Sequence, residues 1–247
     1  MKILLNILTH GDETVGIKVA KDIQKLHLKH GEVVIHRANE LAYRKRKRFV
    51  DQDLNRAFPG KKDGSREQRL AAKILPLTKK ADIVIDIHST RSDLKDAIIV
   101  TKLNKKTREY IEAIAPKYAL LMNATKHNAL ISQAKVGIAF EYGKNGDPAT
   151  RRKTTIGIER LLAHLDMIPR RAAPAVQTTW LEVYTAVPKP NGARVLRTIK
   201  NYKLIRKGAP YGVLKGEKIL AKHDFYPILF GENTYKEIFG FAARVLK

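Results

Sequence analysis

The stretch KILLNILTHGDE, residues 2–13, decides the fold that we expect for this chain. Its first part, Lys2–Leu8, is a nearly continuous apolar run, which is typical of a strand buried in a parallel sheet. Residues 13–29 then space their apolar side chains at helical intervals. His10 and Glu13 therefore lie where a strand ends and a helix begins, and ligands bind at this edge of open α/β sheets.

The same alternation of strand and helix continues to about residue 165. Helical spacing and capping residues predict further helices, and short apolar runs predict further strands. This order favours an α/β fold, with a mostly parallel or mixed sheet sandwiched by helices. The expected strands are 32–36, 82–87, 97–101 and 136–142, and the expected helices are 65–80, 105–115 and 149–165.

The alternation of expected strands and helices ends after Met167. Residues 168–174 contain two prolines and read as a linker. Beyond them the segments are short, rich in β-forming residues and separated by Gly and Pro. We therefore predict an α/β domain over 1–167 and a small C-terminal β-rich domain over 168–247, whose expected strands are 179–187, 195–199, 203–205, 218–221 and 225–230.

Composition narrows the classes of protein to consider. The 247 residues include no cysteine, so disulfides and thiolate metal ligands are excluded, and any zinc must be bound by His and carboxylate side chains. No apolar run approaches the roughly 18 residues that span a bilayer. The N-terminus lacks the basic and apolar regions of a secretion signal. We expect a cytoplasmic protein with no membrane partner, and the sequence leaves homo-oligomerisation open.

The formal net charge of +24 is the strongest feature of the composition. Such a charge is compatible with nucleic-acid binding, because Lys and Arg release counterions from phosphates. However, the basic residues are spread along the whole chain, and the cluster at 44–48 contains no aromatic side chain. We therefore favour a positive field that attracts anionic substrates over nucleic acid as the primary partner.

A second histidine at a strand end suggests a metal site. His88 follows the expected strand 82–87, just as His10 follows the first strand. Together with Glu13, these residues offer two imidazoles and one carboxylate with an open fourth position, which is the ligand set of a catalytic zinc. Asp86 could orient one of these metal ligands without binding the metal itself. The simpler alternative for His88 is a strand-end histidine hydrogen-bonded within a loop.

Four further residues carry groups that such a metal site would use. Glu141 ends the expected strand 136–142 and is a candidate general base, although pairing with a nearby Lys or Arg is the alternative. Asn55 and Arg56 can bind a substrate carboxylate side by side. Arg48 could polarise a carbonyl, although it ends a basic run of the kind that mostly faces solvent.

Four motifs of this chain occur in the order and spacing of one known family: His10-x-x-Glu13, Arg48-x-x-x-x-Asp53-Leu54-Asn55-Arg56, Asp86-Ile87-His88-Ser89 and Phe140-Glu141-Tyr142-Gly143. Over residues 1–165, and weakly beyond, the chain resembles the succinylglutamate desuccinylase/aspartoacylase family of the zinc carboxypeptidase clan. The resemblance implies a zinc-carboxypeptidase-like fold, a catalytic first domain and a second domain that caps the active site. It also implies a deacylase that hydrolyses the amide of a small anionic N-acyl amino acid.

The resemblance also implies a role for each site residue. His10, Glu13 and His88 would bind one Zn²⁺ per chain, and Glu141 would activate the water and protonate the departing amine. Arg48 would polarise the amide carbonyl. Substrate would be bound by Asn55 and Arg56, and by Tyr235 in the segment that resembles the family's closing segment.

The sequence departs from aspartoacylases at one position of the resemblance. Those enzymes carry an Arg about ten residues before the catalytic Glu, whereas residues 128–133 here contain no basic residue, and Lys126 and Lys135 only flank them. N-acetylaspartate is therefore not the expected substrate. Arg91 is a further candidate for anion binding without an assigned partner. Two other functions stay open, a metallocarboxypeptidase acting on peptides and a basic nucleic-acid-binding protein with a vestigial metal site.

Overall fold

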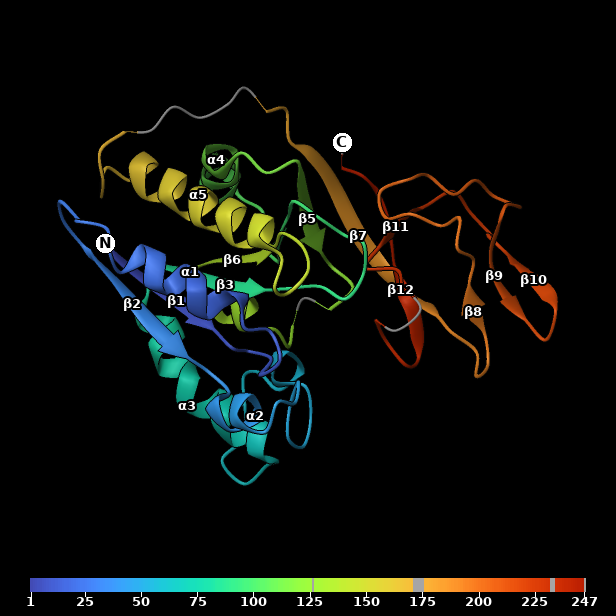
Figure 1. Cartoon of the computed structure of the whole chain (residues 1–247), viewed down its shortest axis with the longest axis horizontal. Helices are drawn as coiled ribbons and strands as arrows, with labels where there is room; N and C mark the ends of the chain where they lie inside the picture. Colours follow the sequence, from blue (N-terminus) through green and yellow to red (C-terminus); the bar gives the residue numbers. More distant parts are fainter. Residues whose placement is uncertain (126, 171–175, 232–233, 247) are drawn as a thin grey trace.

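The computed structural model describes residues 1–125, 127–170, 176–231 and 234–246 (Figure 1). Among these residues, nine strands form one mixed sheet in the order β11-β12-β7-β5-β4-β6-β3-β1-β2. Its strands are β1 (Lys2–Ile7), β2 (Glu32–Arg37), β3 (Ile83–His88), β4 (Ala97–Val100), β5 (Tyr118–Met122), β6 (Val136–Glu141), β7 (Thr179–Pro188), β11 (Tyr226–Ile228) and β12 (Ile238–Val245).

The half of the sheet built from β2, β1, β3 and β6 is parallel, as the sequence predicts. The register places Asn6 beside Asp86 and His88 beside Glu141. Because parallel strands end at the same edge, the residues that follow β1, β3 and β6 meet there. The mixed α/β fold is thereby confirmed.

Helices cover both faces of this sheet (Figure 1). On one face lie α1 (Val15–Ile23), α4 (Lys105–Ile114) and α5 (Pro148–His164), which share the largest apolar cluster with the sheet. The other face carries α2 (Glu40–Arg44) and α3 (Arg66–Lys80), and a second apolar cluster there contains residues of α3. The short 3₁₀ helices η1 (Leu54–Arg56) and η2 (Leu130–Gln133) lie in loops.

Helix α1 is shorter than the predicted 13–29 at both ends. Its start is displaced because Glu13 belongs to a tight turn, in which its N–H donates to the carbonyl of His10. Its end at Ile23 precedes residues that are mostly exposed and that turn the chain toward β2. Helix α3, in contrast, begins as predicted, because Ser65 and Gln68 form a capping box.

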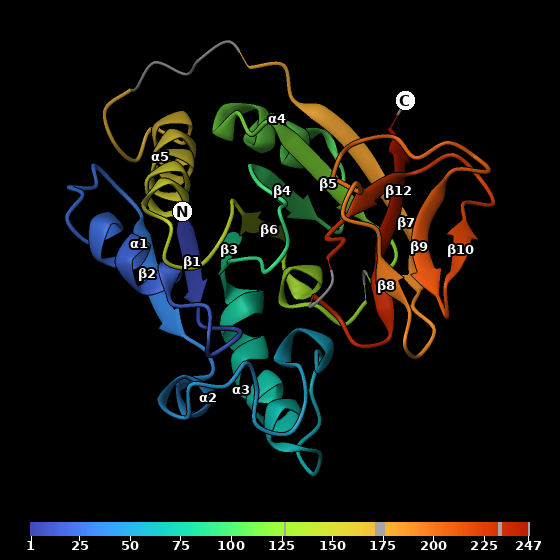
Figure 2. The ribbon, with the colours of Figure 1, turned by 45° about the vertical axis from the view of Figure 1, so that its right-hand side comes forward.

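Residues after 176 divide between two sheets (Figure 2). β7 pairs in parallel with β5, and β12 and β11 follow it at the edge of the large sheet. A separate antiparallel sheet contains β8 (Arg194–Val195), β9 (Pro210–Leu214) and β10 (Glu217–Leu220). The small C-terminal β-rich region is therefore present, while the domain boundary at residue 167 stays a prediction.

Several strand predictions in the C-terminal part are wrong in extent. The expected strand 195–199 is reduced to the end of β8, and within 203–205 only Ile205 forms an isolated bridge, to Phe225. The sequence reading missed β5, β9 and β12. Glycine and proline weaken the strand signal of β9, and β12 contains Gly240 at a φ of 151° with shifts of register beside it.

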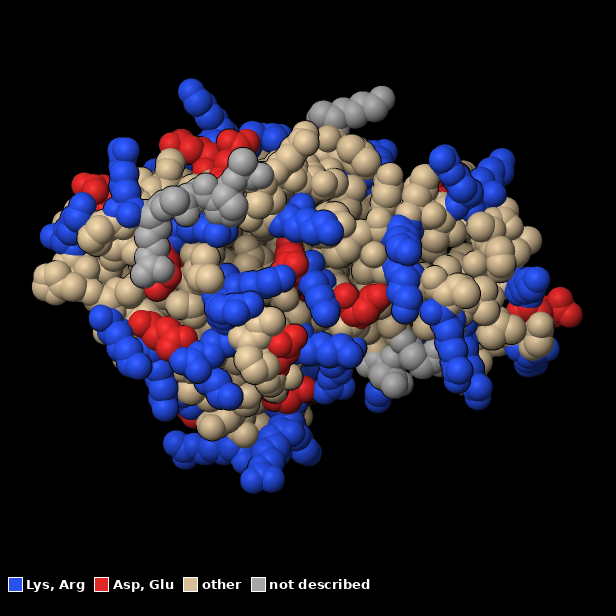
Figure 3. All heavy atoms as spheres, turned by 45° about the horizontal axis from the view of Figure 1, so that its top comes forward, with Lys and Arg blue, Asp and Glu red and all other residues tan. Residues whose placement is uncertain are grey.

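The surface carries the expected excess of basic side chains. Lys and Arg side chains are spread over the face drawn in Figure 3 rather than gathered over one element. Within the described ranges, no helix combines the length and the apolar character that crossing a bilayer requires.

Candidate active site

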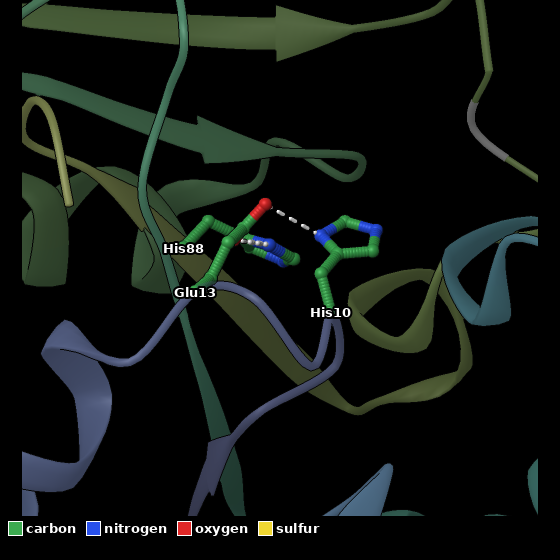
Figure 4. Close-up of side chains that lie close together, drawn as sticks. All are labelled: His10, Glu13 and His88. Carbon is green, nitrogen blue, oxygen red and sulfur yellow. Dashed lines mark hydrogen bonds and ion pairs between the residues drawn. The ribbon is translucent and has the colours of Figure 1, made fainter. Parts of the chain in front are cut away.

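His10, Glu13 and His88 form a buried cluster at the edge where β1 and β3 end (Figure 4). Nδ1 of His10 lies 2.8 Å from Oε1 of Glu13, and Nδ1 of His88 lies 3.0 Å from Oε2. One ligand atom from each residue lies within 4.8 Å of the others. The three residues are at most 5% exposed, so water competes weakly for them. The structure thus brings together the three predicted metal ligands.

A second carboxylate lies behind each imidazole. Asp86 Oδ2 is 2.8 Å from Nε2 of His88, and Asp53 Oδ1 is 3.0 Å from Nε2 of His10. Such contacts orient the rings so that each Nδ1 faces Glu13, as in carboxylate–histidine–metal arrangements, and Nε2 of His10 also lies 3.0 Å from Nη2 of Arg48. Two imidazoles and a carboxylate with this support match the donor set of a catalytic zinc site.

The charges of this cluster stabilise one another in the folded protein. Burial alone would raise the pKa of Glu13, but the two adjacent imidazoles hold it well below its usual range. Burial likewise opposes protonation of His88, but the carboxylates of Asp86 and Glu13 raise its pKa well above 6.5. Asp86 is itself saturated with donors, since Asn6 and Thr9 both donate to its Oδ1.

Backbone geometry turns the chain sharply from β1 into the cluster. Leu8 adopts a φ of 60°, which is uncommon outside glycine and aims the chain away from the sheet. At Gly11 a Cβ atom would lie 2.3 Å from the backbone of Ala42 and Tyr43, so only glycine permits this approach. The N–H of Gly11 also donates to the carbonyl of Arg48, which attaches the loop after α2 to the turn.

That loop supplies Arg48 and Asp53. The Arg48 guanidinium donates to Oε1 of Glu13 at 2.7 Å and lies 3.6 Å from Asp53. Arg48 is therefore turned toward the cluster and is not one of the solvent-facing cations of its basic run. The sequence alone assigned no role to Asp53, although Asp53 belongs to the motif that contains Arg48, Asn55 and Arg56.

A buried carboxylate on α3 holds this loop in place. Glu67 is 0% exposed, and it accepts the N–H groups of Val50, Asp51 and Gln52 at 2.8, 3.0 and 3.3 Å. It also accepts from the side chain of Asn39, which caps α2. Glu67 thus connects α2, the loop and α3, a role that the sequence alone did not reveal.

Glu141 lies beside the cluster at the end of β6. Its Oε2 atom is buried and has no hydrogen-bond partner among the residues that the structure describes. Burial raises the pKa of its carboxyl group to about 7, and the nearby charge of Glu13 adds to this effect. A buried carboxylate without a partner is costly, so this geometry indicates a group that serves a ligand.

A cavity extends from the cluster and includes the predicted substrate-binding residues. His10, His88 and Glu141 line it together with Asn55, Arg56 and Tyr235. Asn55 accepts the N–H of Leu130 through Oδ1, and Arg56 donates to the carbonyl of Asn55. The ring of Tyr235 packs edge-on against Phe241. The structure therefore brings all eight predicted site residues to one place, and their individual roles stay predictions.

The opposite side of this cavity was not predicted. It consists of buried apolar side chains from β4, β5, β6, η2 and β12, and from the residues directly before η2 and directly after β11. We call this surface the apolar wall, and its members are Ile99, Met122, Ala129, Ile131, Ala139, Leu229 and Phe241.

The other charged candidates do not line this cavity. Arg91 lines an adjacent polar pocket together with Glu13, Arg48 and Glu141, and its guanidinium pairs with Asp12. Lys135 is exposed and pairs at 3.7 Å with Asp82. Lys126 lies outside the described residues.

The fold and the cluster together define a zinc-carboxypeptidase-like α/β enzyme. Residues 2–167 match the model of the succinylglutamate desuccinylase/aspartoacylase catalytic domain. The chain therefore belongs to the succinylglutamate desuccinylase/aspartoacylase family, which confirms the resemblance. As a member of this family of deacylases it is an enzyme that hydrolyses amide bonds.

Individual relatives agree with this assignment. An N-acyl-aromatic-L-amino acid amidohydrolase from Xenopus tropicalis is 26% identical, over 93% of this chain and 87% of its own. A probable aspartoacylase from Prochlorococcus marinus is 24% identical, over 96% and 90%. The crystal structure of murine aminoacylase 3 superimposes with a TM-score of 0.83 at 19% identity, covering 100% of this chain and 95% of that one.

Proposed function

We propose that the chain is a zinc-dependent deacylase that hydrolyses the amide bond of small N-acyl amino acids. The observation that carries this proposal is the unpartnered Oε2 of Glu141 beside the His10–Glu13–His88 cluster. A base, a metal-ligand set and an anion-binding pair line one cavity. This is the combination that hydrolysis of an anionic amide requires.

One Zn²⁺ per chain would be held by His10, Glu13 and His88. When bound, zinc activates water as a nucleophile at neutral pH and polarises carbonyl groups. The chain's own contribution is to fix the ligand atoms. Asp86 and Asp53 orient the two imidazoles, and burial excludes competing solvent.

Glu141 would move the proton in this reaction. Its carboxylate would accept a proton from the attacking water and would deliver that proton to the departing amine nitrogen. A pKa raised by burial to about 7 suits a group that must both accept and donate a proton near neutral pH. No other protein group competes for Oε2 within the described part of the chain.

The remaining residues would position the substrate. Asn55 and Arg56 would bind its α-carboxylate, since the amide oxygen of Asn55 is engaged by Leu130 and its NH₂ group is left to donate. Arg48 would polarise the amide carbonyl. Tyr235 would close over the substrate from the C-terminal region, in line with a capping role for residues 168–247.

Residues of the C-terminal part, 168–247, also help to distinguish a deacylase from a carboxypeptidase. Leu229, Tyr235 and Phe241 line the cavity from the C-terminal part of the chain. A wall at this position limits the length of a bound ligand, which favours a small acyl amino acid over a peptide. Cytoplasmic location, homo-oligomerisation and the minor place of nucleic acid stay predictions.

Amine release from a panel of N-acetyl, N-formyl and N-succinyl amino acids tests the proposal. Wild type and Glu141→Gln are assayed side by side in added zinc, and bound zinc is measured for both. We expect hydrolysis by wild type only, with equal zinc in the two proteins. Equal rates would refute the role of Glu141, and no hydrolysis by a zinc-loaded wild type would refute the deacylase.

A further inference from the structure

The lining of the cavity beside the cluster is of two chemical kinds. Asn55, Arg56 and Glu141 belong to its polar part, and the members of the apolar wall pack in one hydrophobic cluster. If Asn55 and Arg56 bind the α-carboxylate, the side chain of the same amino acid lies next to them and meets the apolar wall. The inference below therefore rests on the proposed function and names its substrate class.

We propose that the amine half of the substrate carries an aliphatic side chain that packs against the apolar wall. The enzyme then acts on N-acyl derivatives of residues such as leucine, valine or methionine, in preference to those of aspartate or glutamate. Burial of the aliphatic side chain between Met122, Ile131 and Phe241 supplies the binding free energy for this preference.

A second carboxylate would find no partner on this wall. The described cations that line the cavity are Arg48 and Arg56. Arg48 is paired with Glu13, and Arg56 lies beside Asn55 at the proposed α-carboxylate site. The nearby Lys102 donates to the carbonyl of Ala134 and does not line the cavity. Among the described residues, an acidic side chain packed on the apolar wall would therefore have no free cation beside it, which is unfavourable.

The size of the cavity restricts the side chain further. Its volume is about 60 Å³. The same space must also accommodate the amide and the α-carboxylate, so a compact branched side chain is favoured over an indole ring.

Selectivity of the wild-type enzyme is the first test. We compare kcat/KM for N-acetyl-L-leucine, N-acetyl-L-aspartate and N-acetyl-L-tryptophan in the zinc-loaded protein. N-Isovaleryl-L-aspartate is included because it moves the aliphatic group to the acyl half. We expect kcat/KM for N-acetyl-L-leucine to exceed that for either aspartate derivative by about 100-fold. It should exceed that for N-acetyl-L-tryptophan by about 10-fold. Preference for N-acetyl-L-aspartate, for N-isovaleryl-L-aspartate or for tryptophan would each overturn the inference.

A variant of the wall is the second test, with a matched control on the same strand. Met122 faces the cavity, while Leu121 packs in the cluster on the opposite face of the sheet. Met122→Ala should lower the leucine-to-alanine ratio of kcat/KM about 10-fold. Leu121→Ala should leave that ratio within about 2-fold even if it lowers stability. Equal changes in the two variants would overturn the inference.

Binding separates failure of this inference from failure of the proposed function. Calorimetric titration of Glu141→Gln with N-acetyl-L-leucine and N-acetyl-L-aspartate reports the cavity without turnover. Tighter binding of N-acetyl-L-leucine, together with no hydrolysis by wild type, would support the preference of the apolar wall for an aliphatic side chain and would refute the deacylase. Equal or tighter binding of aspartate would refute the inference whether or not hydrolysis occurs.

Discussion

The two sides of the cavity are built in different ways. The polar side takes His10, His88 and Glu141 from the ends of β1, β3 and β6, which are adjacent parallel strands. The apolar wall takes one or two residues from each of several segments between β4 and β12. The proposed catalytic groups are thus concentrated in short motifs, whereas the surface proposed to select the substrate is distributed over the fold.

Glu141→Gln should have the largest effect. Loss of general acid–base catalysis lowers kcat by about 10²–10⁴-fold. The reduction should be the same for every substrate that the enzyme hydrolyses, because Glu141 acts on the reacting atoms and not on the side chain. Initial rates on two substrates, one leucine and one alanine derivative, measure this. A reduction of kcat for only one substrate would show that the polar side also takes part in selecting the substrate.

Asp86→Asn should weaken zinc binding by about 10–100-fold, because Asp86 orients the ring of His88. Competition with a chromogenic chelator measures the change in Kd. Asp82→Asn is the matched control, since Asp82 directly precedes β3 and contacts Lys2 and Lys135 but not a histidine. An equal loss of affinity in both variants would contradict a specific role of Asp86.

Glu67→Gln should destabilise the protein by about 2–3 kcal/mol, because an amide cannot accept all the backbone N–H groups that Glu67 binds. Chemical denaturation measures the free energy of unfolding. Glu40→Gln, which breaks an exposed pair with Arg37, should cost at most about 1 kcal/mol. KM should also rise in Glu67→Gln, because the loop that it holds carries Arg48.

The effect of Glu67→Gln should depend on pH. Burial alone would raise the pKa of Glu67, but the hydrogen bonds donated by Val50, Asn39 and Asp51 lower it below 4.5. The folded state therefore binds fewer protons than the unfolded state. The stabilisation is complete above about pH 4.5 and is lost as pH falls through the lower, folded pKa. The difference between wild type and variant should shrink over this range, and a constant difference would contradict it.

Ionic strength should have the smallest effect. With a net charge of +24, long-range attraction raises the encounter rate of anionic substrates. Raising the salt concentration from about 0.02 to 0.5 M shortens the screening length, so kcat/KM should fall on the order of 3–10-fold while kcat stays constant. A fall in kcat would instead show that salt acts on the groups in the cavity and not on the long-range attraction of the substrate.

Much of the fold could be predicted, because strands β1, β3 and β6 are apolar runs with sharp ends. Helices α3 and α4 begin at the side-chain caps Ser65 and Asn104, which are visible in the sequence. Strands β5 and β12 could not be predicted in this way. Their alignment depends on pairing with β7, and pairing between distant segments leaves no local periodic signal.

The groups that we assign to catalysis could be predicted from the sequence. His10 and Glu13 follow β1, while His88 and Glu141 end β3 and β6, and adjacent parallel strands bring their ends together at one edge. What surrounds these groups depends on long-range packing. Glu67 became a support for the loop, and Met122, Ile131 and Phe241 became one wall, because long-range packing placed segments far apart in the chain against one another.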